Sequence, residues 1–280
     1  MKKYYFLFTL IFFVSFAIFF NERFSPTPFL TSVSTAWRTD AANPRLNDIY
    51  DIKFKLSRTP SGTLNTYMPK YKTLDIDGAI YYFLLFGMNV SEPDVSAAIE
   101  ETEQYFSCSD ENGSVYVSKY GNLINYVTKA AKGEDELITS EEALKIAEDF
   151  IDKRFLFLSY EEAETNFDGE TYEVCFINRI GNIKNYSFTT SVTLNANGGV
   201  KSLTYYNIHY QRLGSVKTIS METAATRLPL DLPDGELIEL AKCSLAYIYE
   251  DSVVQPAYLF EGVTSTGDAF KCFINAASYG

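Results

Sequence analysis

ITSEEALKIAEDFI, residues 138–151, gives the clearest structural signal in the chain. Thr139 and Glu142 have the spacing of a capping box, in which each side chain accepts the backbone N–H of the other residue. Behind them, apolar residues recur at the three- and four-residue spacing of a helix that buries one face. These residues are Ala143, Ile146, Ala147, Phe150 and Ile151. We therefore expect an amphipathic helix that lies on a sheet.

The residues after this helix alternate as strands do. Tyr172, Val174 and Phe176 are separated by polar or small residues, and residues 185–194 repeat the pattern. A turn at Asn197-Gly198-Gly199 leads into a further predicted strand over residues 200–206. The sequence predicts a helix followed by antiparallel hairpins.

The same order of residues returns later in the chain. Ile219-Ser220 followed by Ala224 matches Ile138-Thr139 followed by Ala143, at an offset of 219 − 138 = 81. Strand-like runs at 245–249, 257–263 and 270–276 complete the second copy. We interpret this as an internal repeat of a helix and hairpins. The predicted fold class is α+β, with an N-terminal transmembrane helix followed by tandem domains of a helix packed on an antiparallel β-sheet.

The region before the first copy has weaker signals. Alternation predicts a strand over 49–56, Asp75 or Asp77 predicts a helix to about Phe86 that Gly87 ends, and Pro93 predicts a second helix. Runs at 114–120 and 123–127 predict a hairpin with a two-residue turn at Gly121-Asn122. The predicted domains are an N-terminal α+β domain over 46–132 and a C-terminal α+β domain with both copies over 133–280.

An uncharged run from Tyr4 to Phe20 follows Lys2 and Lys3. Its 17 residues are at the short end of what spans a hydrocarbon core of roughly 30 Å, and no small-residue cleavage site follows. We expect an uncleaved transmembrane signal anchor at 1–22 and a linker at 23–45; a cleaved signal and a buried soluble helix are the alternatives. The lysines predict a single-pass membrane protein with a cytoplasmic N-terminus and an extracytoplasmic body.

The composition and motifs indicate little chemistry. With 24 basic and 36 acidic side chains the net charge is 24 − 36 = −12, which disfavours binding to nucleic acid. The single histidine, His209, stands alone, no metal-ligand spacing or phosphate-binding loop occurs, and the acidic runs suit solvated surfaces. Asp110 to Gly113 is expected to form a turn. We expect no metal, no cofactor and no enzymatic activity.

Two groups of side chains suggest contacts. Ser15 and Ala17 are small residues that allow close packing on another membrane helix, although the segment can equally be a plain anchor. Among 21 tyrosines, Tyr205, Tyr206 and Tyr210 are candidate partner-contact residues, with packing between strands as the alternative.

The four cysteines are too widely spaced for a metal motif. In an exported protein a disulfide between Cys243 and Cys272 is the most natural pairing, and buried free thiols are the alternative.

This order of parts resembles the YycH/YycI-type regulators of the WalK/WalR two-component system of low-GC Gram-positive bacteria, and the YycI type most. The resemblance rests on the short anchor, the openings at Ile138 and Ile219, and the endings at 256–260 and 273–276. Tyr258 stands where the family pattern leads us to expect Trp. Similar openings and endings occur in PepSY-like repeats.

The resemblance implies a non-catalytic membrane protein that contacts a sensor histidine kinase and a second single-pass regulator, and so modulates the kinase. The alternative function is an exported PepSY-like binding module that inhibits a protease or binds an envelope ligand.

Overall fold

The computed structural model describes residues 46–88, 90, 99–129, 131, 133, 136–154, 156, 160–230 and 237–278. The predicted anchor at 1–22, with Ser15 and Ala17, and the predicted linker at 23–45 lie outside the described residues. In the part of the chain that is described, no helix has the length and apolar character needed to cross a bilayer.

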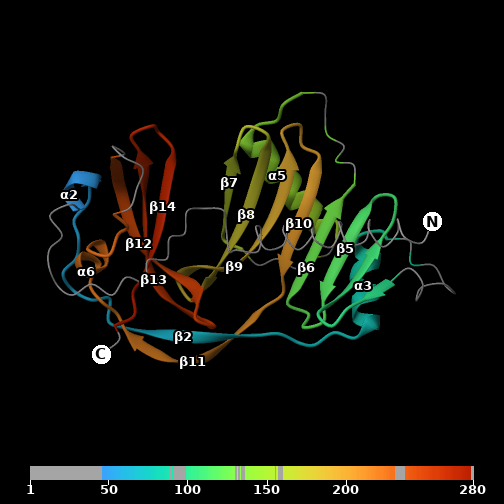
Figure 1. Cartoon of the computed structure of the whole chain (residues 1–280), viewed down its shortest axis with the longest axis horizontal. Helices are drawn as coiled ribbons and strands as arrows, with labels where there is room; N and C mark the ends of the chain where they lie inside the picture. Colours follow the sequence, from blue (N-terminus) through green and yellow to red (C-terminus); the bar gives the residue numbers. More distant parts are fainter. Residues whose placement is uncertain are drawn as a thin grey trace, which may run out of the picture. The chain divides into compact units, whose positions relative to one another are not determined.

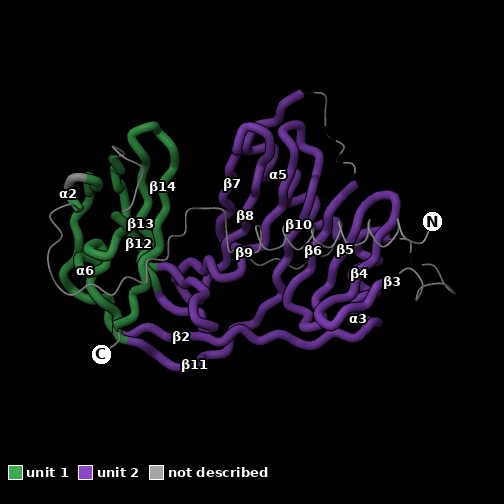
Figure 2. The backbone as a smooth tube through the Cα atoms, viewed as in Figure 1, with its two compact units in different colours: residues 1–62, 217–245, 257–280 green, residues 63–216, 246–256 purple. Residues whose placement is uncertain are grey.

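Contacts divide the chain into two compact units, which Figure 2 colours separately. The described residues of unit 1 come from 46–62, 217–245 and 257–278, and those of unit 2 from 63–216 and 246–256. The units interleave along the sequence, which a division into consecutive ranges does not describe.

Unit 2 contains an antiparallel sheet with the strand order β7-β8-β9-β10-β6-β5-β4-β3 (Figure 1). Two further strands of this unit, β2 and β11, lie beside each other. The strands span Thr63–Lys70 (β2), Ile99–Glu101 (β3), Tyr105–Ser109 (β4), Gly113–Ser118 (β5), Leu123–Thr128 (β6), Glu162–Phe167 (β7), Thr171–Ile180 (β8), Ile183–Asn195 (β9), Val200–Tyr206 (β10) and His209–Lys217 (β11).

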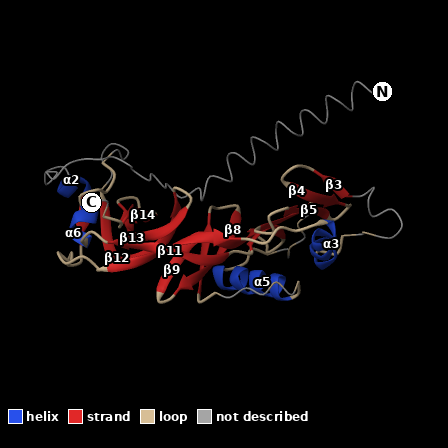
Figure 3. Ribbon diagram, turned by 90° about the horizontal axis from the view of Figure 1, so that it is seen from below, coloured by secondary structure: helices blue, strands red, loops and turns tan. Residues whose placement is uncertain are grey.

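Two helices cover one side of this sheet, as Figure 3 shows. They are α3 (Ile76–Leu85) and α5 (Ser140–Asp152). The predicted capping box of α5 is confirmed, because the Thr139 hydroxyl accepts the Glu142 N–H and the Glu142 carboxylate accepts the Thr139 N–H. The predicted apolar face is also confirmed: Ala143, Ala147 and Ile151 of α5 are buried in the same core as the sheet. The helix therefore stabilises the unit through its buried face.

Unit 1 is smaller, and its strands run in both directions. Strand β1 pairs with β12 in parallel, and β13 pairs with β14 antiparallel. Its core contains Ile238, Leu240 and Phe260, all fully buried. Its elements span Leu46–Ile49 (α2), Tyr50–Ile52 (β1), Met221–Ala225 (α6), Ile238–Glu250 (β12), Val253–Thr264 (β13) and Ala269–Asn275 (β14). The ends of β12 and β13 near their shared turn belong to unit 2.

The two similar segments of sequence make the same contacts. We call α5, β7, β8 and β9 copy 1, and α6, β12, β13 and β14 copy 2. In copy 1 the Tyr172 hydroxyl donates to the Ile138 carbonyl at 2.6 Å, and the Ile138 N–H donates to the Ala196 carbonyl at 3.0 Å.

In copy 2 the Tyr258 hydroxyl donates to the Ile219 carbonyl at 3.0 Å, and the Ile219 N–H donates to the Ala276 carbonyl at 2.8 Å. We call this pair of hydrogen bonds the tyrosine latch. In both copies it joins the residue before the helix cap to the following hairpin.

The predicted fold class is wrong. Over the described residues the structure is mostly a large mixed β-sheet, with 54% strand and 14% helix, and not tandem domains of a helix packed on an antiparallel sheet. Copy 2 shows the physical reason. Helix α6 has only 5 residues, whereas β12 and β13 have 13 and 12 residues, and β12 pairs in parallel with β1 and with the start of β9. A long strand forms hydrogen bonds with partners far apart in the sequence, and no local pattern reveals them.

Several smaller predictions are also corrected. The acidic segment behind Pro93 ends in strand β3 and not in a helix, because Ile99 is buried against the sheet while Glu100 and Glu101 are exposed. The predicted strand over 49–56 shortens to β1. The hairpin of β5 and β6 is confirmed, but its last pair is Val117–Ile124, so its connection is longer than two residues.

Candidate protein-contact surface

Helix α3 begins and ends where the sequence predicts. The Asp75 carboxylate accepts the Gly78 N–H at 3.0 Å and so caps the helix. Gly87, just beyond the C-cap residue Phe86, has a φ of +71°, the left-handed conformation that glycine adopts without a steric penalty. The helix is therefore fixed at both ends by local sequence.

The helix is apolar on the side that faces the solvent as well as on the side that faces the core. Its Ala79 and Phe83 side chains are fully buried. On the other side, Tyr81 and Leu84 are 54% and 57% exposed, with Asp77 of the first turn on the same face. Ile76, the first residue of the helix, is 37% exposed. A helix at the surface of a monomer normally carries polar side chains on its outer face. An outer face of this kind indicates contact with another molecule.

A pair of tyrosines lies at the amino-terminal side of α3. The rings of Tyr71 and Tyr120 meet edge to face, with centroids 5.8 Å apart, and both are about half exposed. The Leu74 N–H donates to the Lys119 carbonyl at 2.7 Å and ties this segment to the β5–β6 connection. We call the following exposed side chains the α3 patch: Tyr71, Ile76, Tyr81, Leu84 and Tyr120.

The predicted contact residue Tyr205 is in the core. It is 8% exposed, and burial raises the pKa of its hydroxyl, with Tyr82 and Tyr81 nearby. Tyr82 in turn packs edge to face on Tyr81 at 5.5 Å, and its pKa is raised by burial. Tyr205 therefore lies behind α3 and supports it from the sheet.

Tyr206 and Tyr210 are half-buried. The Tyr206 ring packs on Phe188 with centroids 5.5 Å apart, and burial raises the pKa of its hydroxyl. Tyr206 follows Tyr205 in the same strand, so the two side chains point to opposite faces of the sheet. Burial raises the pKa of Tyr210 to about 12, against the effect of a hydrogen bond with Asn185. A contact of these two residues with a partner stays a prediction.

The sequence contains a signal for the α3 patch that strand alternation does not reveal. Helix α3 reads IDGAIYYFLL and has one charged residue, Asp77, which lies in its first turn. The remaining positions leave no polar stripe. A helix next to solvent with a single charged residue is the observation that points to this surface, whereas tyrosine density along the strands marks mainly the core.

Side chains that could bind a metal ion do not gather at one site in the described part of the chain. His209 is exposed at the start of β11. Within the described ranges, no three His, Cys, Asp or Glu side chains gather in a way that could hold a metal ion. The Asp110 carboxylate accepts the N–H groups of Asn112 and Gly113, which confirms the predicted turn.

All four cysteines are free thiols. Cys243 lies on β12 and Cys272 on β14, and β13 runs between these two strands. Two strand spacings are about 9.5 Å, beyond the reach of a disulfide. The alternative of free thiols therefore holds for this pair. Burial raises the pKa of each to about 12.

Comparisons with known proteins identify no family. No protein-family model and no curated protein matches the sequence. Among solved structures, the chain resembles the Bacillus megaterium YpeB C-terminal domain, with 16% identity and a TM-score of 0.44. The match covers 74% of this chain and 95% of that chain. The match does not point to YycI, and a TM-score of this size does not establish a shared fold or function.

Proposed function

We propose that this protein is an exported PepSY-like binding module that holds another envelope protein through the α3 patch. The supporting observation is the apolar outer face of α3, with Tyr81 and Leu84 more than half exposed. Inhibition of a protease and binding of another envelope ligand are the two forms of this function that the sequence leaves open. The module acts by binding and not by catalysis.

The α3 patch has the composition of a binding surface. Tyrosine offers a large rigid face and a polar tip, and such residues contribute strongly when they are buried at the centre of an interface. Full burial of one large apolar side chain contributes about 1.5–3 kcal/mol. The capped, tightly packed helix holds these side chains in place before a partner arrives, which reduces the entropy lost on binding.

Photo-crosslinking in the native cell tests this proposal. A crosslinking residue is placed at position 84 of the full chain, and the matched control carries it at Leu213 on β11, which is also about half exposed. We expect one partner to crosslink at position 84 and not at 213, and Tyr81→Glu to abolish the crosslink at position 84. Equal products at both positions, or none at 84, contradict the proposal. Addition of the purified chain to the recovered partner then distinguishes protease inhibition from binding of another ligand. Loss of the partner's proteolytic activity identifies protease inhibition.

An extracytoplasmic location is part of this proposal. It is motivated by the basic residues Lys2 and Lys3 ahead of the apolar run from Tyr4 to Phe20. Protease is added to intact cells whose outer barrier has been removed. It is expected to degrade the exported part of the protein, and complete protection of that part would contradict an extracytoplasmic location. Modulation of a sensor kinase, with a second single-pass regulator as partner, stays a prediction from the resemblance. If the protein that crosslinks at position 84 is a sensor kinase, modulation of that kinase becomes the favoured function.

A further inference from the structure

Strand β7 forms one end of the unit 2 sheet. Within the described residues it pairs only with β8. At the turn, the Asp168 N–H donates to the Thr171 carbonyl at 3.2 Å, and hydrogen-bonded pairs alternate along an antiparallel ladder. The even-numbered residues of β7 therefore bond to β8. The odd-numbered residues Ala163, Thr165 and Phe167 direct their backbone N–H and C=O groups outward, away from the sheet.

The corresponding strand of copy 2 has a partner on this side. β12, the first strand after α6, pairs with β13 on one side and with β1, in parallel, on the other. Tyr50 lies opposite Ile238, and the Lys53 N–H donates to the Leu240 carbonyl at 3.0 Å. The same arrangement thus binds an extended segment at the outer side of its first strand in copy 2, whereas no strand of the described residues occupies that position in copy 1.

The segment bound in copy 2 shows which side chains suit this position. Tyr50 is 2% exposed and Ile52 packs on the core of unit 1. Asp51 and Lys53 alternate with them on the other face, where the Lys53 ammonium lies 2.5 Å from the Asp51 carboxylate and 3.9 Å from the Glu239 carboxylate of β12. Asp51 itself lies opposite Glu239, so Lys53 offsets the charge of both acids. Large apolar residues therefore alternate with charged residues, among them a lysine that lies between an acid of its own segment and an acid of the first strand.

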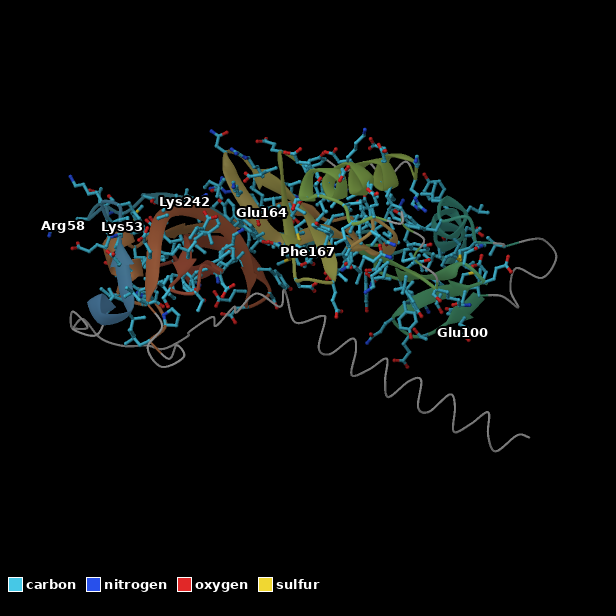
Figure 4. The ribbon with its side chains drawn as sticks, turned by 90° about the horizontal axis from the view of Figure 1, so that it is seen from above. Lys53, Arg58, Glu100, Glu164, Phe167 and Lys242 are labelled. Atoms are coloured by element: carbon cyan, nitrogen blue, oxygen red, sulfur yellow. The ribbon has the colours of Figure 1, made fainter. Side chains whose placement is uncertain are left out.

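The side chains of β7 fit the same kind of segment. On the face toward α5, Phe167 stacks on Tyr172 at 4.4 Å and is still 49% exposed, which leaves apolar surface for a neighbour. On the opposite face lie Glu162 and Glu164, and Figure 4 labels Glu164 and Phe167 on the strand. The Glu162 side chain keeps 41% exposure beside Lys184, so it has room for a second cation.

We propose that the outer edge of β7 binds an extended peptide by strand addition, in the parallel direction that β1 takes on β12. The peptide carries large apolar side chains at alternate positions and at least one lysine or arginine between them. Backbone hydrogen bonds to Ala163, Thr165 and Phe167 provide affinity, and the alternating faces provide selectivity. This inference is independent of the proposed function. The α3 patch lies against β4 and β5, near the other end of the same eight-strand order, across about 30 Å of sheet.

The probe for this site is a labelled peptide with the sequence of residues 49–56, IYDIKFKL, which contains the segment bound in copy 2. Titration into the full chain, followed by fluorescence anisotropy, is expected to saturate. A peptide with Glu in place of both lysines is expected to bind at least about tenfold more weakly, because acidic side chains on β7 repel it.

Methylation of peptide nitrogens tests strand addition without any change in the protein. In copy 2 the Lys53 N–H bonds to the neighbouring strand, so alternation places the Asp51 N–H on the same side. N-methylation at these two positions of the probe should abolish binding, whereas N-methylation at Tyr50 and Ile52 should leave it unchanged. Equal effects of the two methylation patterns would overturn the proposal.

A proline substitution locates the peptide on the protein. Thr165→Pro removes an outward N–H that the ladder with β8 does not use, and edge strands tolerate such a proline. The matched control is Glu101→Pro in β3, at the other end of the sheet. The Thr102 N–H donates to the Tyr105 carbonyl of β4, so by alternation the Glu101 N–H points away from the sheet. We expect at least a tenfold loss of affinity for Thr165→Pro alone. Absence of saturable binding to the unmodified chain, or equal affinity of the two folded variants, would refute the site.

The two proposals fail separately. Thr165→Pro should leave the crosslink at position 84 intact, and Tyr81→Glu should leave peptide binding intact. Loss of both properties in either variant would show that one surface serves both, and would overturn the assignment of the peptide to β7.

Discussion

The two copies share the tyrosine latch but differ in what surrounds it. In copy 1 the helix has 13 residues and covers its sheet, whereas in copy 2 the helix has 5 residues and its core also includes Tyr50 from β1. The hydrogen bonds to Ile138 and Ile219 are nevertheless the same. The two copies therefore share the hydrogen bonds that join the start of the helix to the hairpin. The elements that pack on the hairpin differ between them.

The largest difference between the copies should appear on truncation of matched core residues. Phe260 and Val174 each lie two residues after the latch tyrosine, opposite Cys272 and Val192, and both are fully buried. Phe260→Ala should destabilise unit 1 by about 3–5 kcal/mol. Val174→Ala removes two methyl groups and should destabilise unit 2 by about 1.5 kcal/mol before any cavity term.

Hydrogen exchange of native amides, read separately for each unit, measures both losses. A matched control, Val263→Ala, changes an exposed side chain of β13 and should leave exchange nearly unchanged. A smaller loss for Phe260→Ala than for Val174→Ala would show that copy 2 does not depend on its core as the structure implies.

Removal of the latch hydroxyls should have the next largest effect, and a similar one in both copies. Tyr172→Phe and Tyr258→Phe each leave a buried carbonyl without its donor, which costs about 1–3 kcal/mol. The loss for Tyr258→Phe should be the larger of the two, since its hydroxyl also lies 2.9 Å from the Ser61 hydroxyl. Urea unfolding monitored by circular dichroism measures the free energies. A neutral effect in one copy alone would mean that the latch is structural only in the other.

The latch also explains how much of the fold the sequence reveals. Helix α5 is predictable because its cap and apolar stripe are local. The repeat is only partly visible, because its offset is 219 − 138 = 81 at the helix caps, 258 − 172 = 86 at the tyrosines and 276 − 196 = 80 at the alanines. Loops of different length between the elements shift the register, so no single offset aligns the copies.

The remaining parts of the fold and of the candidate site depend on distant partners. Nothing near Tyr50 in the sequence reveals that it pairs with β12, almost 190 positions away. Tyr205 and Tyr81 have similar local sequences of paired tyrosines, yet one is in the core and the other is exposed. Which side of an aromatic segment meets the solvent depends on the elements that pack on it, and composition does not contain that information.

Loss of the helix caps should have a smaller effect. The Thr139 hydroxyl accepts the Glu142 N–H at 3.3 Å, and the Ser220 hydroxyl accepts the Thr223 N–H at 3.1 Å. Thr139→Ala and Ser220→Ala should each cost about 1 kcal/mol, and Thr139→Ser and Ser220→Thr should cost much less. Thermal unfolding measures the loss. In copy 2 the whole helix should lose exchange protection, because five residues cannot form a helix without the cap.

The smallest effect, a dependence on pH, should distinguish the two caps. The backbone N–H and the hydroxyl of Thr139 both donate to Glu142 and hold the pKa of its carboxyl below the ordinary value. Such a group adds stability above the pKa of the unfolded state, and the gain disappears as the pH falls through the lower pKa of the folded state. Copy 2 has Thr223 at the matching position and no charge to titrate. Acidification should therefore weaken the capping hydrogen bonds of α5, whereas the cap of α6 contains no carboxylate and its first-turn acid Glu222 only pairs with the exposed Arg58. Glu142→Gln should remove the pH dependence of the α5 cap. The pH profile of amide exchange in the two helices measures the difference, and parallel profiles for α5 and α6 would contradict it.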